Sequence, residues 1–234
     1  MTARHRALVL LLPVVAFLGC SRSKAPEPDL EPASPPPAVQ LKSPDVLVIT
    51  VDTLRADRLG CYGFEAARTP HIDRLSREGV RVEHAVAPAP ITMPSHTSIF
   101  TGLEPPAHGV RDNGAFPVPQ RIETLAERLK SAGYQTQAFV SAEVLHSRYG
   151  LNQGFDGYDD ELWNETAPTD FKRQERSADK TIDRALRWLS QRQKHGDPLF
   201  LWVHLFDPPQ PYEPPESDKR GVPSWSDGQI AVAD

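Results

Sequence analysis

The stretch DVLVITVDTLRADRLGCYG, residues 45–63, begins with an unbroken run of β-branched and aliphatic residues that is followed at once by Asp52. Such a run is typical of a strand that is covered on both faces, as in a parallel sheet. Ligands gather at the carboxyl ends of parallel strands, so Asp52 stands where a carboxylate could hold a hard metal ion. A lone aspartate after a strand can equally cap the following turn, and spacing alone favours the cap.

Strand and helix patterns alternate along the rest of the chain. Helices are predicted at 69–79, 123–133 and 177–193, where apolar residues recur at helical spacing. Further strands are predicted at 80–87, 134–140 and 198–206. This alternation indicates the α/β class with a mostly parallel sheet flanked by helices.

A second informative stretch, ITMPSHTSIFTG at 91–102, predicts a helix that starts at Pro94 and Ser95 and stops at Gly102. Thr92 then lies just before the helix N-terminus, where the helix dipole favours negative charge. With help from a metal, its hydroxyl could attack a phosphorus or sulfur centre and form a covalent intermediate. The alternative is that Thr92 or Ser95 merely caps the helix, which local considerations favour.

Several other polar residues are candidates for the same chemistry. His96 and His108 could contact an oxyanion or serve as acid and base near neutral pH. Arg111 and Asn113 could donate hydrogen bonds to anionic oxygens, and His204, at the end of its predicted strand, is a weaker candidate. Each of these residues also has an ordinary packing or loop interpretation.

The first 43 residues differ in composition from the remainder. Residues 1–20 have a short basic region, an apolar run and then Gly19 before Cys20, which is the layout of an export signal. It resembles a bacterial lipoprotein signal, in which Cys20 would be lipidated; an ordinary signal peptide or an uncleaved anchor is the alternative. Residues 21–43 are rich in Pro, Ser and Ala and are expected to form a disordered tether.

This layout predicts a folded domain over 44–234, exported to the bacterial cell envelope, periplasmic or at the outer surface, and held at the membrane by a lipid anchor. The formal net charge of −5 and the pI near 5.9 give no basic footprint, so no nucleic-acid partner is expected.

Four segments in order carry a resemblance to a known family: VLVITVDTLRADRLGCYG, TPHIDRLSREGV, TMPSHTSIFTG with AHGV, and FLWVHLFDPPQPYEPP. Together they resemble the N-terminal part of the sulfatase family, within the alkaline phosphatase superfamily. The resemblance implies a divalent metal, calcium or zinc, held partly by Asp52, with Thr92 as nucleophile and further metal contact. It also implies a sulfate or phosphate ester as substrate.

The sequence departs from the family's pattern at the nucleophile. A typical sulfatase carries Cys or Ser at the position of Thr92, which is oxidised to formylglycine, and Arg at the position of His96. Threonine cannot give the aldehyde, so no formylglycine is expected, and a direct threonine alkoxide resembles the phosphatase and phosphotransferase relatives. Thr53 stands where many sulfatases have a second metal-binding Asp, and Pro209 where a His often occurs.

Family members are also longer, and a downstream Asp-His-Gly segment that completes their metal site does not occur in this sequence. We therefore expect a chain truncated at its C-terminus. Two functions follow: a metal-dependent hydrolase of sulfate or phosphate esters, or a catalytically inactive or truncated envelope lipoprotein that keeps only part of the fold.

Overall fold

The strands build one sheet in which all the described pairings are parallel. The computed structural model describes residues 43–162, 175–192, 196–206 and 230, all within the compact unit Leu41–Asp234. The strand order is β1-β4-β2-β3. The strands are β1 (Val46–Val51), β2 (Gln135–Phe139), β3 (Gly157–Asp159) and β4 (Leu199–Leu205). The helices are α1 (Pro70–Glu78), α2 (Thr92–Thr101), α3 (Pro105–His108), α4 (Leu125–Ser131) and α5 (Ala178–Gln191), with short 3-10 turns at 56–58, 60–62, 143–145 and 147–149.

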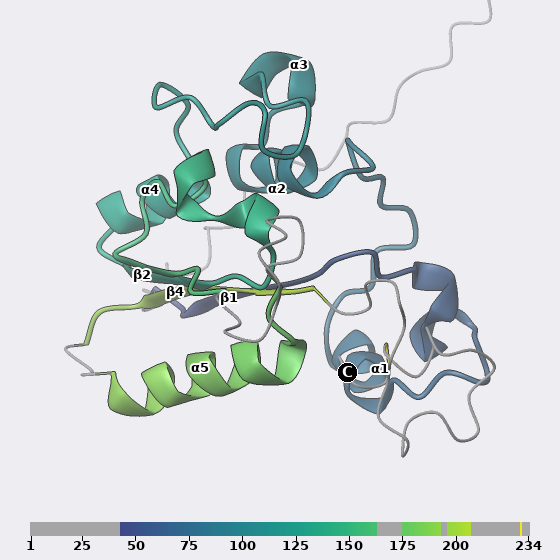
Figure 1. Ribbon diagram of the computed structural model, residues 1–234. Coiled ribbons are helices and arrows are strands. Elements are labelled where there is room, and N and C mark those ends of the chain that lie inside the picture. The colour runs from purple at the N-terminus through teal and green to yellow at the C-terminus, as the bar shows by residue number, and fades with distance from the viewer. Residues whose placement is uncertain (1–42, 163–174, 193–195, 207–229, 231–234) are drawn as a thin grey trace, which may run out of the picture. The chain divides into compact units, whose positions relative to one another are not determined.

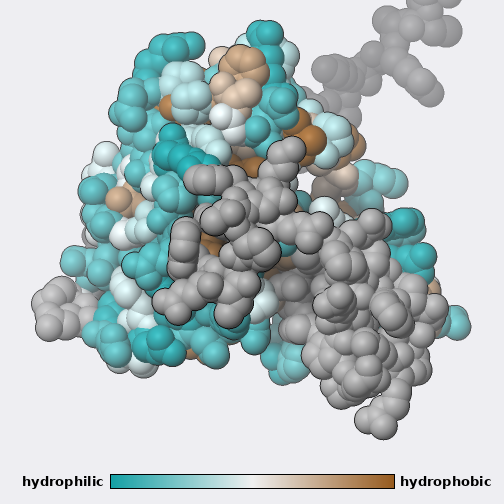
Figure 2. All heavy atoms as spheres, viewed as in Figure 1, coloured by the Kyte–Doolittle hydropathy of each residue, from teal (hydrophilic) through white to brown (hydrophobic). Residues whose placement is uncertain are grey.

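Helices cover both faces of this sheet. Figure 1 shows α2 and α4 on one face and α5 on the other. Side chains alternate between the faces of a strand, so β4 contributes Phe200 and Trp202 to the core beneath α2 and α4, and Leu201 and Val203 to the core above α5. The outer side of α5 carries mainly hydrophilic side chains (Figure 2). The predicted α/β class with a parallel sheet is therefore confirmed.

The register of β1 against β4 positions the polar residues at the carboxyl edge of the sheet. Thr50 is paired with His204, and the backbone N–H of Asp52 donates to the carbonyl of Leu205 at 2.9 Å. Because alternate residues share a face, Thr50 and Asp52 lie on the same side of β1 as Val48, which packs against the core beneath α2. The strand alternation thus brings Thr50, Asp52 and His204 to the α2 side of one edge.

Several sequence predictions about the elements were wrong. β1 was expected to be covered on both faces, but Leu47 and Ile49 are 58% and 56% exposed. The physical reason is that β1 is an edge strand of the described sheet and α5 packs mainly over β4 and β2. The predicted strand at 80–87 does not form, since every residue in it is exposed and no described strand pairs with it. The helical spacing of residues 177–193 also predicted that Leu186 of α5 shares one apolar face with Ile182, Ala185 and Leu189, but Leu186 is 58% exposed.

The helix of the second informative stretch begins at Thr92 rather than at Pro94. The predicted stop at Gly102 is confirmed, since this glycine has a φ of 68° and its N–H donates to the carbonyl of Ser98. The short elements α3 and β3 were not predicted. Neither is long enough to show a period in the sequence.

Some expectations lie outside the described residues. These are the export signal with Cys20, nearly all of the tether, and the segment that follows Phe206, Pro209 included. In the described part of the chain, no helix combines the length and the hydropathy needed to cross a membrane.

Candidate active site

The centre of the site is a contact between the end of β1 and the start of α2. The hydroxyl of Thr92 donates a hydrogen bond to Oδ2 of Asp52 at 2.8 Å. The two residues are brought together because β1 ends at the carboxyl edge of the sheet and α2 begins over the same edge. The lone pairs of the Thr92 oxygen are not used in this bond, so they remain available to another group.

The N-terminus of α2 is capped by a residue from elsewhere in the chain. The side-chain oxygen of Asn113 accepts a hydrogen bond from the backbone N–H of Met93 at 2.9 Å. Thr92 is the first residue of the helix, and its hydroxyl donates to a carboxylate instead of accepting from the helix backbone. The capping interpretation of Thr92 therefore does not describe this helix, since Asn113 has that role.

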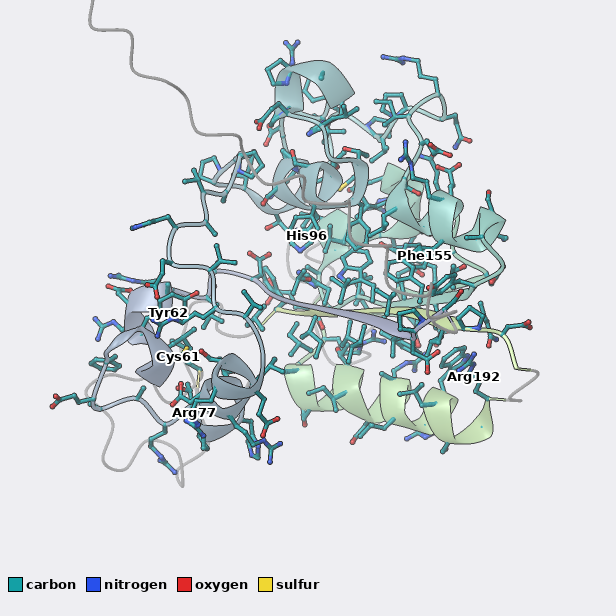
Figure 3. The ribbon with its side chains drawn as sticks, turned by 180° about the vertical axis from the view of Figure 1, so that it is seen from behind. Cys61, Tyr62, Arg77, His96, Phe155 and Arg192 are labelled. Atoms are coloured by element: carbon teal, nitrogen blue, oxygen red, sulfur yellow. The ribbon has the colours of Figure 1, made fainter. Side chains whose placement is uncertain are left out.

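His96 lies between α2 and the sheet (Figure 3), and both of its ring nitrogens are engaged. Nδ1 lies 2.8 Å from the carbonyl oxygen of Thr92, which can only accept, so Nδ1 carries the proton. Nε2 then accepts from the hydroxyl of Thr50 at 3.1 Å, and that hydroxyl in turn accepts from the indole N–H of Trp202 at 3.1 Å. Burial, followed by the nearby His204, lowers the pKa of His96 to about 4. His96 is thus a neutral histidine that holds the backbone of Thr92.

His204 lies on the other side of Asp52 and is fully buried. Its Nε2 is 3.6 Å from Oδ2 of Asp52, which is longer than a hydrogen bond. Its ring meets the ring of His96 edge to face, with centroids 4.9 Å apart. Burial lowers the pKa of His204 even though the carboxylate of Asp52 acts in the opposite direction. No surface of His204 is open to a substrate, so it cannot contact an anion directly as the sequence suggested.

The carboxylate of Asp52 is held on both oxygens. Oδ1 accepts from the backbone N–H of Thr53 at 2.8 Å, while Oδ2 faces Thr92 and His204. Burial acts to raise the pKa of Asp52, but its interactions with His204, Thr92 and His96 together outweigh burial, and the pKa lies below its usual value. Thr53 has a φ of 57°, a left-handed conformation that a β-branched residue rarely adopts. Backbone strain of this kind is concentrated at functional sites.

These side chains border an open cleft of about 510 Å³. Its polar lining comes from Thr50, Asp52, Thr53, Thr92, Ser95, His96 and Asn113. Its apolar lining comes from Val51, Leu54, Ala87, Ala89, Pro90, Ile91 and Ile99. Asp52 is the one charged residue among the described residues of this lining, so the cleft carries negative charge.

Two of the predicted site residues lie elsewhere. His108, the last residue of α3, is buried against α2, where its Nδ1 accepts from the N–H of Val110 at 3.0 Å and its Nε2 lies 3.0 Å from the hydroxyl of Ser98. Burial also lowers its pKa. Arg111 is exposed and is absent from the lining of the cleft in the described part of the chain. The structure therefore brings together Asp52, Thr92, His96, Asn113 and His204, but not His108 or Arg111.

Two residues that the sequence analysis overlooked support this cluster. Thr50 joins His96 to Trp202, and Ser141, just beyond β2, contacts His204 through both its backbone N–H and its hydroxyl. Thr50 could have been found, because it is a polar residue in an aliphatic strand, two positions before Asp52 and so on the same face. Ser141 had no such signal, since its role depends on how β2 and β4 are paired.

The donors present fit the beginning of a site for a hard cation. Asp52 and Thr92 offer carboxylate and hydroxyl oxygens, the ligand type that calcium and magnesium prefer. Within the described residues, no group of three or more His, Cys, Asp or Glu side chains is arranged to hold a metal. Further ligands would have to come from other parts of a complete site or from water.

Comparison with known proteins gives consistent matches. The sulfatase family model matches residues 44–230. Over 137 residues the chain is 38% identical to steryl-sulfatase from Mus musculus, a match that covers 54% of this chain and 21% of that protein.

Solved structures show the same similarity. One is a protein in complex with its substrate, D-glucosamine-2-N,6-O-disulfate, with 26% identity, a TM-score of 0.61, and coverage of 73% of this chain and 36% of that one. Another is the phosphonate monoester hydrolase of Agrobacterium radiobacter, with 22% identity, a TM-score of 0.61, and coverage of 76% and 44%; it supports the fold alone. The chain thus spans less than half the length of these relatives. Since the family model covers most of its residues, this chain belongs to the sulfatase family.

Proposed function

We propose that this protein is a metal-dependent hydrolase of sulfate or phosphate esters in which Thr92 is the nucleophile. The observation that carries the proposal is the hydrogen bond from the Thr92 hydroxyl to Oδ2 of Asp52, two residues that line an open cleft. Membership of the sulfatase family supports the class of substrate. One relative is a steryl-sulfatase and another is bound to a disulfated glucosamine substrate, which supports a sulfate ester.

The charge of the cleft supports the need for a metal. A sulfate or phosphate ester is an anion, and the charged group it would meet among the described lining residues is the carboxylate of Asp52. The two negative charges would repel each other, so the ester would bind poorly without a cation. When bound at Asp52, a divalent cation would reverse the local charge, polarise the ester and lower the pKa of the Thr92 hydroxyl.

The residues of the chain would then divide the work as follows. Asp52 Oδ2 accepts the proton of the Thr92 hydroxyl as the Thr92 oxygen bonds to sulfur or phosphorus. The ester oxygen leaves with its bonding electrons and takes a proton from water, which releases the alcohol. The hydroxide left by that water next attacks the threonyl ester, sulfate or phosphate departs, and the proton on Asp52 returns to the Thr92 oxygen.

His96 has a positioning role in this scheme. Its Nδ1–H holds the carbonyl of Thr92, and its Nε2 is fixed by Thr50. Both nitrogens are occupied and the ring is neutral, so we do not assign it acid or base chemistry. These two hydrogen bonds of His96 keep Thr92 at a constant orientation toward Asp52.

Turnover measured with and without metal tests the proposal. An aryl sulfate, a phosphate monoester and a phosphate diester would be offered side by side to the purified chain, with calcium, magnesium or zinc alone or with a chelator. Turnover of one ester that the chelator stops and metal restores would support the function and identify both ester and metal. A folded protein that binds no metal and hydrolyses none of the three would favour the catalytically silent alternative.

We also propose that the protein is exported and lipidated at Cys20, which would hold the site at the bacterial cell envelope. The basis is the signal layout of the first residues. The expected result is that the protein partitions with membranes when expressed in a bacterium, and that Cys20→Ser releases it. Partitioning that is unchanged by the substitution would contradict lipidation.

A further inference from the structure

The buried Nε2 atom of His204 has no hydrogen-bond partner. In the described part of the chain it is one of two buried side-chain nitrogen or oxygen atoms in this state; the other is Oε1 of Gln153. Buried polar groups are nearly always paired, and leaving one unpaired costs about 1–3 kcal/mol. The position of this atom therefore requires an explanation that ordinary core packing does not give.

The neighbouring backbone decides which nitrogen of His204 carries the proton. The N–H of Ser141 donates to Nδ1 at 3.3 Å, and the hydroxyl of Ser141 donates to the carbonyl of His204 at 2.7 Å. Because Nδ1 accepts, the neutral ring must carry its proton on Nε2. A nitrogen that bears a proton cannot ligate a metal, so this geometry excludes His204 Nε2 as a metal ligand.

Among the described residues, the surroundings of Nε2 offer one acceptor. Both nitrogens of His96 are already used, by Thr92 and Thr50, and the ring of Phe206 stacks near His204 without offering an acceptor. The remaining group is Oδ2 of Asp52 at 3.6 Å. A movement of roughly half an ångström would turn this contact into a hydrogen bond.

We propose that His204 is a positioning residue that directs Nε2–H at Oδ2 of Asp52 and so fixes the carboxylate toward Thr92. The proposal rests on the function proposed above. With Thr53 holding Oδ1, and Thr92 and His204 on Oδ2, the carboxylate has a single orientation. Partners of this kind set the geometry of a metal-binding group without touching the metal.

Two substitutions separate the two roles of the His204 ring, which accepts a hydrogen bond from Ser141 and donates toward Asp52. His204→Asn can keep an acceptor near the N–H of Ser141 but loses the donor toward Asp52, whereas His204→Gln can reach Asp52 with an amide donor. We expect His204→Asn to weaken binding of calcium, magnesium or zinc alone by about 10- to 100-fold, measured by calorimetry on the full-length chain, with kcat reduced similarly. His204→Gln should recover most of both losses. His84→Asn, at an exposed histidine outside the cleft, is the matched control and should change neither.

Nitrogen NMR of the labelled protein provides a readout that does not depend on turnover or on metal. The proposal requires a neutral His204 with its proton on Nε2, and a spectrum that shows the proton on Nδ1 would overturn it. Metal affinity and kcat unchanged in His204→Asn would also overturn it. If the wild-type chain hydrolysed no ester, the proposed function would fail by itself, and the tautomer would still decide whether His204 faces Asp52 as a donor.

Discussion

Thr92 and Asp52 are joined by a 2.8 Å hydrogen bond although 40 positions separate them in the chain. The donor is the hydroxyl and the acceptor is the carboxylate, so the threonine oxygen keeps its lone pairs while its proton already points at a base. A hydroxyl with this environment is suited to nucleophilic attack once the negative charge of the carboxylate is offset.

Removing the hydroxyl of Thr92 should stop ester turnover. We expect Thr92→Val, which keeps the shape of the side chain, to lower kcat by at least about 1,000-fold, as for other catalytic nucleophiles. Thr92→Ser retains a hydroxyl and should keep measurable turnover. Thr101→Val, at the last residue of the same helix, is the matched control and should behave as the wild type. Turnover retained by Thr92→Val would remove Thr92 from the mechanism.

Asn113 should affect stability and substrate binding separately. Asn113→Ala removes the cap of α2 and should lower the free energy of unfolding by about 1 kcal/mol. Asn113→Asp keeps an oxygen acceptor for the N–H of Met93, so stability should be retained, yet the added negative charge at the cleft should raise KM for an anionic ester. Urea denaturation and steady-state kinetics on the two variants measure these effects; an unchanged KM in Asn113→Asp would argue that the ester binds away from this residue.

The buried state of His96 should make stability depend on pH. Its pKa is lowered from 6.5 to about 4 by burial and by His204. The unfolded chain therefore binds a proton that the folded chain refuses, so stability is fully present above pH 6.5 and falls as the pH falls from 6.5 toward 4. Between about pH 7 and about pH 5, we expect the free energy of unfolding to drop by something on the order of 1–2 kcal/mol from this group.

Substituting His96 tests whether this residue causes the pH dependence of stability. His96→Asn should be less stable than the wild type at neutral pH, because the bonds to Thr92 and Thr50 are disturbed, but its stability should depend less on pH in this range. His84→Asn, at an exposed histidine, is the matched control for the substitution itself. Equal pH dependence in the wild type and His96→Asn would show that His96 is not held neutral.

A buried ion pair supports the network behind the site. Arg176 donates to Asp159 at 2.7 Å and to the hydroxyl of Thr181, which contacts Ser141. Arg176 is 7% exposed, so Asp159→Ala would leave its charge buried without this partner. We expect a loss of about 3–5 kcal/mol in the free energy of unfolding. Glu123→Ala removes an exposed partner of Arg128 and should leave stability nearly unchanged; similar losses in both variants would contradict the difference in burial.

The sequence predicted the parts of this fold that have a strong local signal. β1, β2, β4 and α5 were found within one or two residues, because aliphatic runs and helical spacing are visible without knowledge of the tertiary structure. The exposure of Leu47 and Ile49 was not predictable, since a covered strand and an edge strand have the same apolar sequence. The strand predicted at 80–87 failed because the alternation of Val80 and Val82 gives a strand only where a partner strand is available, and the sequence does not show whether one is.

The sequence predicted most of the residues of the site, but not the roles that several of them have. The family resemblance implied that Asp52 and Thr92 share one metal site, and the structure brings the two side chains into contact. His96 and His108 were both predicted to contact an oxyanion or to act as acid and base, because a histidine in a sequence carries no sign of its burial. The burial of these rings comes from tertiary contacts, such as those of Ser98 with His108 and of Ser141 with His204, which the sequence does not show.

The central claim is that Thr92 becomes covalently bound to the sulfur or phosphorus of the substrate. The most direct test is to mix the metal-loaded chain with the best ester, quench with acid during turnover, and determine by peptide mass spectrometry which residue has gained a sulfo or phosphoryl group. We predict that the group is found on Thr92 and that neither the chelated protein nor Thr92→Val acquires it. Turnover that continues with Thr92 unmodified, or a modified residue elsewhere in the chain, would contradict this account.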